Sequence, residues 1–299
     1  MPVVGFLGNS TAALEAKLVD AFRGGLREFG YAEGRNIRIE YRWAEGRYER
    51  LPALIGELIA AKVDVIVTAG TPASLAVKKA TASIPLVMVA VGDPVGTGLV
   101  ASIARPGGNA TGLTSITPEL EGKRLELIKE VVPAVSRLAV FWNPENAYQA
   151  ADEKKVEAAA ALLHIPVLPL AVRKAEELDA SFAAILDHHA DAVLVLADRL
   201  FLHNRNRIID FCVAHRLPTM NAYRELVDAG GLMSFGPSYA MMHWQAARYV
   251  DKILRGVKPQ DLPIEQPAKF EFVVNLKAAG ALGITVPREV MTRADEVIE

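Results

Sequence analysis

The chain has 299 residues, of which 51% are hydrophobic and 23% are charged, a composition typical of a globular protein with a substantial core. Lys and Arg number 33 against 35 Asp and Glu, so the formal net charge is −2. This balance argues against a nucleic-acid partner or an anionic membrane surface. The single Cys212 excludes an internal disulfide and a multi-cysteine metal site.

Short apolar runs alternate with longer amphipathic segments along the chain. Over the first 90 residues the spacing predicts strands at 3–7, 37–43, 63–68 and 85–89, and helices at 13–29, 51–61 and 72–81. Because these strands are almost wholly apolar, we expect a parallel sheet with helices on both faces. The longest stretch without Asp, Glu, Lys or Arg, 229–247, contains several glycines and a proline, and predicts a turn followed by a helix rather than a membrane span.

The same pattern recurs about 130 residues later, which is the size of an ordinary domain. The sequence Phe6-Leu7 is matched by Phe141-Trp142, and Ile84-Pro85 by Leu217-Pro218. We therefore expect an α/β fold of two Rossmann-like lobes with parallel sheets, joined by a multi-crossover hinge. The first lobe is expected to comprise residues 1–114 and 237–262, and the second 115–236 and 263–299. A ligand cleft is expected between the lobes.

Motifs for common enzyme chemistry are missing from the sequence. It contains no G-x-x-x-x-G-K-[ST], no G-x-S-x-G and no H-E-x-x-H. The first strand ends in Gly5-Phe6-Leu7-Gly8, which lacks the third glycine of a dinucleotide-binding fingerprint. The histidines are scattered, without a second ligand at helical spacing. We accordingly expect no catalytic residue, no metal and no cofactor.

Polar residues follow the predicted strands, at the edge where open α/β sheets bind their ligands. The candidate ligand-binding residues are Asn9, Ser10, Gly70, Thr71, Pro72, Asp93, Thr114, Ser115, Asn143, Asn146, Asp198, Asn221, Tyr223 and Ser234. Each has a structural alternative, because Ser10 and Thr71 are also typical helix caps, and Asn143-Pro144 and Asp93-Pro94 typical turn formers. Taken together, the candidates favour one converging site.

The chemistry of these residues indicates an amino-acid-like ligand. The segment Gly70-Thr71-Pro72 opens a helix, and helix N-terminal amides beside a hydroxyl suit a carboxylate. Asp93 supplies a negative charge that could face an ammonium group. On this hypothesis Asp93→Ala costs far more affinity than Asp198→Ala. Trp142 and Tyr223 are candidates for stacking on an aromatic ligand, although each is equally suited to the core.

Several stretches resemble the substrate-binding proteins of bacterial ABC importers, specifically the tryptophan/tyrosine-type family with the type I periplasmic binding protein fold. The matching stretches are FRGGLREFGY at 22–31, AGTP at 69–72, VGDPVGTGLV at 91–100, IARPGGNATG at 103–112, AGGLMSFG at 229–236 and residues 276–283. The resemblance covers nearly the whole chain, and it is most specific from Gly92 to Gly112.

The resemblance implies a receptor, not an enzyme, that closes on a small solute such as an amino acid or aromatic carboxylate and delivers it to a membrane permease. It also implies a periplasmic or lipid-anchored location, although the usual export signal is absent from this sequence and would have been trimmed. A ligand-sensing domain or a small-molecule enzyme on the same two-lobed fold are the alternatives.

Overall fold

A computed structural model describes residues 1–115, 120–267 and 269–299 of the chain. The chain divides into two compact units, the first comprising Met1–Ile116 and Ser238–Ala268 and the second Thr117–Pro237 and Lys269–Glu299. The chain passes between the units three times, and two of the passages adjoin 116–119 and 268, which lie outside the described residues.

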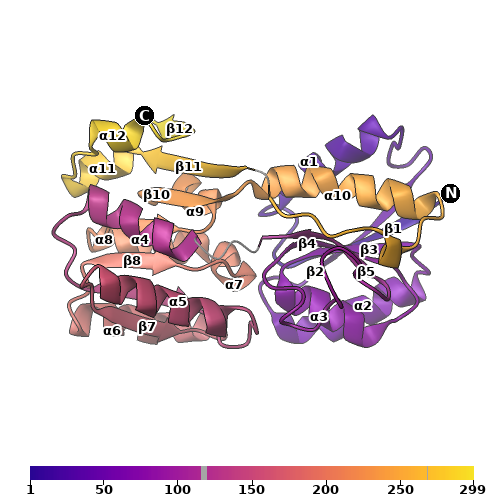
Figure 1. The fold of residues 1–299 in the computed structure, drawn as a ribbon, viewed down its shortest axis with the longest axis horizontal. Helices are drawn as coiled ribbons and strands as arrows, with labels where there is room; N and C mark the ends of the chain where they lie inside the picture. The colour runs from indigo at the N-terminus through magenta and orange to yellow at the C-terminus, as the bar shows by residue number, and fades with distance from the viewer. Residues whose placement is uncertain (116–119, 268) are drawn as a thin grey trace. The chain divides into compact units, whose positions relative to one another are not determined.

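The first unit is a parallel sheet between helices. Its strands are β1 (Val3–Gly8), β2 (Arg38–Trp43), β3 (Val65–Ala69), β4 (Leu86–Val91) and β5 (Ala110–Thr114). Its helices are α1 (Ala16–Glu28), α2 (Leu51–Ala60), α3 (Thr71–Ala80) and α10 (Tyr239–Leu254), with 3₁₀ turns at Tyr48–Arg50 and Pro259–Asp261. The strand order is β2-β1-β3-β4-β5, and every neighbouring pair is parallel. Helices α1 and α10 cover one face and α2 and α3 the other (Figure 1).

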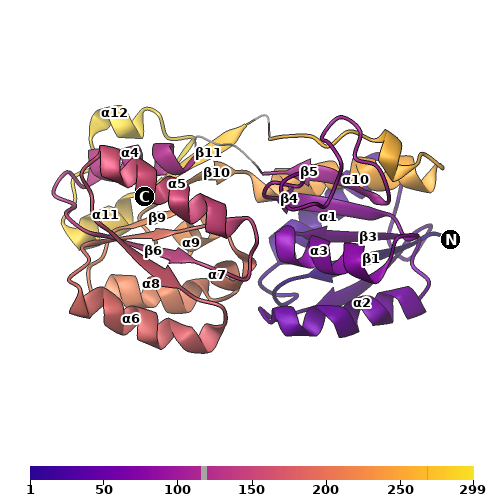
Figure 2. The same ribbon diagram turned by 60° about the horizontal axis from the view of Figure 1, so that its bottom comes forward.

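The second unit has a larger sheet, in the order β12-β11-β10-β9-β8-β6-β7. Its strands are β6 (Leu138–Trp142), β7 (Val167–Ala171), β8 (Ala192–Val195), β9 (Thr219–Asn221), β10 (Met233–Pro237), β11 (Phe270–Asn275) and β12 (Glu296–Ile298). Its helices are α4 (Leu120–Val131), α5 (Gln149–Leu162), α6 (Leu178–Asp187), α7 (Arg199–His203), α8 (Arg205–Ala214), α9 (Arg224–Asp228), α11 (Leu276–Leu282) and α12 (Arg288–Met291), with a 3₁₀ turn at Ala175–Glu177. Helices α4 and α5 cover one face of the sheet, and α6 and α8 the other (Figure 2).

Each unit has its own hydrophobic core. The apolar residues from which the strands and helices are predicted are the residues that fill these cores. Strands β3, β4 and β8 are buried throughout, as nearly continuous apolar runs in a covered parallel sheet must be. On α1, the buried Leu18, Phe22 and Leu26 recur every four residues and so form one apolar stripe. The two-lobed α/β fold is thus the one expected from the alternating pattern.

The second sheet departs from the expectation of purely parallel strands. Strand β10 pairs with β11 antiparallel, for example Phe235 with Phe272. The segment 229–247 also contains strand β10 before its helix, whereas a turn followed directly by a helix was expected. Because β10 includes Gly236 and Pro237, its own residues give only a weak strand signal.

The boundaries between the two units lie a few residues away from those that the sequence predicts. Ser115 lies in the first unit, where its N–H donates to Val91 O at 2.7 Å, and Pro237 ends β10 in the second. Residues 263–267 belong to the first unit instead of the second, because Ile264 N–H donates to Ile103 O at 2.9 Å and Glu265 N–H to Gly112 O at 3.1 Å.

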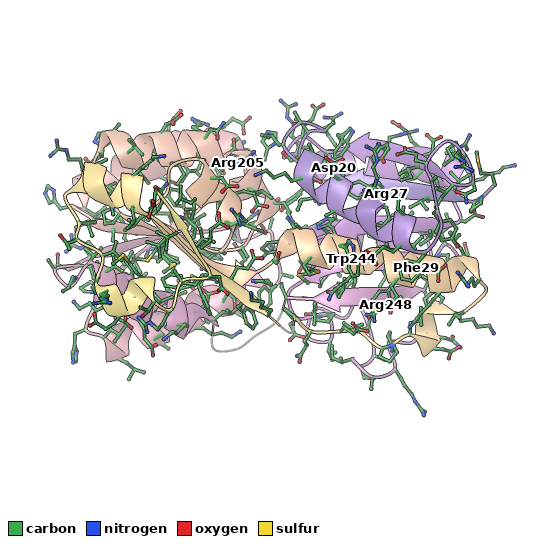
Figure 3. All side chains as sticks on the ribbon, turned by 90° about the horizontal axis from the view of Figure 1, so that it is seen from above. Asp20, Arg27, Phe29, Arg205, Trp244 and Arg248 are labelled. Atoms are coloured by element: carbon green, nitrogen blue, oxygen red, sulfur yellow. The ribbon has the colours of Figure 1, made fainter. Side chains whose placement is uncertain are left out.

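A close approach of α1 and α10 stabilises the first unit. At Gly25 a Cβ atom would lie 2.2 Å from the backbone oxygen of Trp244, so only glycine allows this approach. Figure 3 shows the two helices side by side, with Arg27 on α1 and Trp244 on α10. The helix pair thereby covers the sheet face that carries Phe6, whose ring packs against Phe22 and His243.

Candidate functional site

Each sheet has a point where the chain changes direction along the strand order. In the first unit the chain runs from β1 outwards to β2 and then to β3 on the other side of β1; in the second it runs likewise from β6 to β7 and then to β8. Open α/β sheets bind ligands beyond the carboxyl ends of the strands at such switch points. The candidate site of each unit is therefore the loops after β1 and β3, and after β6 and β8.

In the first unit, Asn9 and Ser10 directly follow β1 and are buried. The Nδ2 group of Asn9 donates to Ala69 O at 2.8 Å, which fixes the orientation of the amide. Its Oδ1 atom is buried and has no hydrogen-bond partner among the described residues. The backbone N–H of Ser10 donates to the carboxylate of Glu15 at 2.6 Å. The loop after β1 therefore presents acceptor atoms.

The predicted segment Gly70-Thr71-Pro72 lies at the same switch point and opens α3. Gly70 has φ of +82°, a conformation that strongly favours glycine, and it is the residue before the helix. The hydroxyl oxygen of Thr71 accepts from Gly92 N–H at 3.1 Å. Because Asn9 binds the backbone of Ala69, the residue next to Gly70, the loops after β1 and β3 lie together. The sequence correctly placed these residues at one edge.

The three candidates after β4 and β5 have structural contacts. The Asp93 carboxylate accepts from the backbone N–H groups of Val95 at 3.1 Å and Gly96 at 2.8 Å, which is a turn-forming arrangement. The Thr114 hydroxyl donates to Val91 O at 2.8 Å, and Ser115 Oγ contacts the same oxygen at 3.3 Å. Both backbone donors contact Oδ1, so Asp93 makes the contacts of a turn former, and a contact of its carboxylate with an ammonium group stays a prediction.

In the second unit, Asp198 joins the loops after β6 and β8. Its carboxylate accepts from Asn143 Nδ2 at 3.2 Å, Asn146 Nδ2 at 2.8 Å and the backbone N–H of Leu200 at 2.9 Å. All three side chains are buried, and Asp198 also caps α7. Three predicted residues are thus brought together, with Asp198 as the group that orients the two asparagines.

Arg199 extends this group toward the loop after β9, although sequence reasoning did not select it as a site residue. Its guanidinium carbon lies 5.3 Å from the centre of the Tyr223 ring, and both residues are buried. Such a stack stabilises a cation and also fixes the ring. A basic residue at the first position of a helix that directly follows a buried strand was the available sequence signal.

Asn221 and Ser234 lie within paired strands and not in a loop. They are register partners of β9 and β10, and both are buried. Asn221 Nδ2 donates to Thr219 Oγ1 and to Met233 O, each at 3.0 Å, so this amide holds the two strands together. The structure therefore gives Asn221 a role in the sheet. The indole of Trp142 packs against the core of the second unit, and its Nε1 is buried without a partner in the described chain.

A buried charged cluster at the N-terminal ends of α4 and α5 was not predicted. Arg124 donates to Glu121 through Nη1 and to Phe235 O through Nε at 2.8 Å, and both side chains are almost fully buried. Tyr148 and Asp152 lie beside this pair. Burial and the Glu121 charge raise the pKa of Asp152 to about 6, while Lys155 at 3.2 Å offsets part of this shift. Burial and the neighbouring carboxylates also raise the pKa of Tyr148.

Asp152→Asn is expected to be more stable than the wild type above pH 6 and equal to it near pH 4. The folded protein holds a proton on Asp152 that the unfolded chain releases from its ordinary pKa of 3.8 upwards, so stability falls as the pH rises from about 4 to 6. The difference should reach on the order of 1 to 3 kcal/mol. Thermal unfolding from pH 4 to 7.5 measures it, with the exposed Glu126→Gln as control; a constant difference would contradict the elevated pKa.

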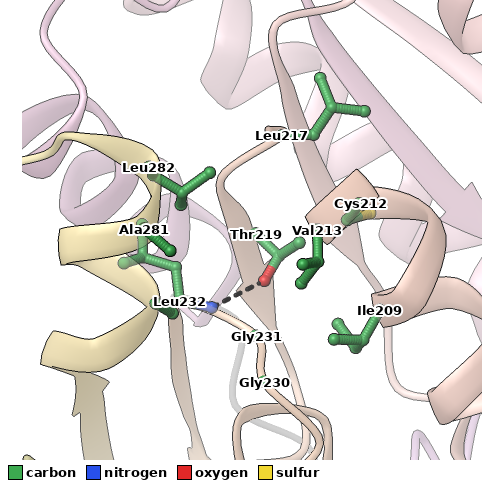
Figure 4. Close-up of a pocket in the computed structure, with 11 residues that line it drawn as sticks. Ile209, Cys212, Val213, Leu217, Thr219, Gly230, Gly231, Leu232, Ala281 and Leu282 are labelled. Carbon is green, nitrogen blue, oxygen red and sulfur yellow. Dashed lines mark hydrogen bonds between the residues drawn. The ribbon is translucent and has the colours of Figure 1, made fainter. Parts of the chain in front are cut away.

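A small, partly open cavity of the second unit lies away from these switch points. It has a volume of about 40 Å³ and is lined by Ile209, Cys212, Val213, Leu217, Thr219, Gly230, Gly231, Leu232, Ala278, Ala281 and Leu282 (Figure 4). Thr219 and Leu232 stand at the amino ends of β9 and β10. Burial raises the pKa of the Cys212 thiol to about 12, so it remains protonated and unreactive. This apolar cavity belongs to the packing of α8 and α11.

The described residues contain no group of three or more His, Cys, Asp or Glu side chains arranged to hold a metal ion. Among the helices of the described segments, none combines the length and hydropathy needed to cross a membrane.

Several known proteins are similar to this chain in sequence or in fold. The family described as ABC transporter substrate binding protein matches residues 10–298. A tyrosine-binding protein of Clostridioides difficile is 25% identical over 257 residues, covering 86% of this chain and 74% of the relative. The crystal structure of a conserved domain protein from Vibrio cholerae superimposes with a TM-score of 0.91 at 29% identity, covering 99% of both chains.

A Streptococcus pneumoniae ABC domain solved in complex with L-Trp superimposes equally well, with a TM-score of 0.91, 25% identity and 99% coverage of both chains. The fold is the two-lobed α/β fold of type I periplasmic binding proteins. The family and the relatives of named ligand are solute-binding proteins and not enzymes. Because the family match spans nearly the whole sequence, this chain belongs to the ABC transporter substrate-binding proteins.

Proposed function

We propose that this protein is the solute receptor of a bacterial ABC importer, that its lobes close on a small amino-acid-like or aromatic carboxylate ligand, and that it passes the ligand to a membrane permease. The observation that carries the proposal is the set of buried polar side chains at both switch points. Asn9 has a buried oxygen with no partner in the described chain, and Asp198 organises Asn143 and Asn146. Most buried polar atoms of folded proteins are hydrogen-bonded, so an unpaired one at a switch point favours a partner from outside the chain.

The groups at these edges support the proposed ligand class. The first turn of α3, which begins at Thr71, offers its dipole and its N-terminal backbone N–H groups to a carboxylate. The N–H of Gly70 itself is already used, because it donates to Val89 O at 2.9 Å. Tyr223 follows β9 and stacks with the Arg199 guanidinium, and we infer that it is the aromatic residue of the second unit nearest the ligand. A relative named for tyrosine binding and a neighbour crystallised with L-Trp support an aromatic amino acid.

The proposed role also sets the protein's location. Substrate-binding proteins of ABC transporters work outside the cytoplasm, so we expect this one in the periplasm or held there by a lipid anchor. Its partner there would be the permease.

Binding is tested by isothermal titration and thermal unfolding of protein that has been unfolded and refolded to remove any copurified ligand. The panel contains L-Trp, L-Tyr, L-Phe, L-Leu and aromatic carboxylates. A ligand at 100 times its dissociation constant should raise the free energy of unfolding by about 2.7 kcal/mol. A response to aromatic amino acids or carboxylates is expected. A refolded protein that responds to none of them would contradict the proposed ligand class.

A further inference from the structure

The end of β1 concentrates hydrogen-bond acceptors at the switch point of the first unit. Asn9 is 1% exposed, and its Nδ2 is committed to Ala69 O, so the orphaned atom is the oxygen Oδ1. A buried acceptor without a donor destabilises the folded protein unless a ligand supplies the donor. Asn9 Oδ1 therefore calls for an N–H or O–H group from outside the described chain.

Glu15 brings a carboxylate to the same place. It is the residue before α1 and is 4% exposed, and its Oε1 accepts from Ser10 N–H at 2.6 Å, next in sequence to Asn9. A Cβ atom built on Gly8 would lie 3.0 Å from Glu15 Oε2 and 2.2 Å from the Trp43 ring. The missing side chain at Gly8 thus leaves room for a carboxylate and an aromatic ring at the end of β1.

We propose that Asn9 Oδ1 and the Glu15 carboxylate form the subsite for the ammonium group of an α-amino acid. This proposal rests on the proposed function and specifies which half of the ligand the first unit recognises. An ammonium group has three donors and no acceptor, so it matches a neutral acceptor beside a carboxylate. Charge-assisted hydrogen bonds of this kind are the stronger ones.

The neighbouring loop fits the other half of such a ligand. Asn9 donates a hydrogen bond to Ala69 O, and Ala69 is followed by Gly70, the residue before α3. The ammonium subsite therefore adjoins the N-terminus of α3, which suits a carboxylate. The ammonium and carboxylate of an α-amino acid are carried by one carbon atom and need adjacent subsites. Asp93 is a weaker candidate, because it is less buried than Glu15 and follows β4, outside the switch point formed by β1 and β3.

The test compares two amino acids with the same molecules lacking the amino group. Dissociation constants are measured by titration calorimetry for L-Trp against indole-3-propionate and for L-Tyr against 3-(4-hydroxyphenyl)propionate. Glu15→Gln keeps the size of the side chain and an oxygen that can accept from Ser10. We expect it to weaken amino-acid binding about 10- to 100-fold and to leave binding of the amino-free analogue within about 3-fold.

Asn9→Ala is the second variant. The ratio compared is the dissociation constant of the amino-free analogue divided by that of the amino acid, and this variant should lower it by about 10-fold if Oδ1 binds the ammonium group. Asp20→Asn, on the exposed side of α1, is the control and should leave the ratio of the two dissociation constants unchanged (Figure 3). Asp93→Asn tests the competing assignment, and a change of the ratio in that variant instead of in Glu15→Gln would overturn the subsite. Thermal unfolding of each variant establishes that it is folded.

The outcomes separate this subsite from the proposed function. If the wild type binds an amino acid and Glu15→Gln weakens both members of a pair equally, or changes neither, the subsite is wrong and the receptor remains. If the wild type binds only the amino-free carboxylates, the subsite is also wrong. If it binds none of the four compounds, the proposed ligand class fails and the subsite with it.

Discussion

Arg124→Met is expected to lower the free energy of unfolding by about 3 to 5 kcal/mol, because it leaves the Glu121 carboxylate buried without its counter-charge. Arg124 is 2% exposed and Glu121 5% exposed, so water does not replace the lost partner. The substitution also removes the hydrogen bond from Nε to Phe235 O on β10. Urea unfolding measures the loss. Of the three tryptophans of the chain, Trp142 lies in the second unit and the other two in the first. In a variant that also carries Trp43→Phe and Trp244→Phe, the fluorescence of Trp142 therefore follows the unfolding of the second unit.

The double variant Glu121→Met, Arg124→Met separates the pair's energy from the cost of an isolated charge. We expect it to recover most of the stability that the single variant loses, because two apolar side chains of similar size need no partner. The control is the exposed pair formed by Glu130 on α4 and Arg293, which follows α12, and Arg293→Met should cost less than about 1 kcal/mol. A double variant that is as unstable as Arg124→Met would show that the contact with Phe235 dominates.

Two of the buried charged residues could not be found from the sequence pattern. Glu15 is the residue before α1 and Arg124 lies in the second turn of α4, and the sequence around them does not distinguish them from charged residues that face water. Arg199 had only the weak signal of a basic residue at the start of a helix. The burial of these residues results from strands and helices far away in the sequence, such as β10 against Arg124. Local periodicity contains no information on those contacts, so sequence reasoning selected Asp93, whose neighbouring glycines and proline stand out locally.

What the sequence did predict depends on local signals. Asn9, Gly70, Thr71, Asn143 and Asp198 directly follow buried apolar strands, and parallel strands place all such residues at one edge. Strand β10 escaped prediction because it is defined by its partners, β9 on one side and the antiparallel β11 on the other, and not by its own alternation. Asn221 and Ser234, which depend on that pairing, were accordingly expected in loops.

Asp198→Ala is expected to lower the free energy of unfolding by about 3 kcal/mol. The loss of a helix N-cap accounts for about 1 kcal/mol, and each of two buried amide groups that lose their acceptor for about 1 kcal/mol more. Those groups belong to Asn143 and Asn146, and the cap is that of α7. Asp93→Ala is the matched comparison and should cost about 1 kcal/mol, because its two backbone donors lie in a more exposed turn. Urea unfolding, with Trp142 fluorescence for Asp198→Ala, measures both.

The stability and the affinity of Asp198→Ala together decide what this carboxylate does. If both fall, Asp198 acts as a positioning residue, because the asparagines that it orients lose their place at the switch point. If affinity falls while stability is unchanged, Asp198 must contact the ligand itself, and the amide hydrogen bonds must be worth little. Asp198→Asn distinguishes the two roles further, since it retains an acceptor for Asn143 and Leu200 but places an NH₂ group against Asn146. A positioning role predicts partial recovery of both stability and affinity in that variant.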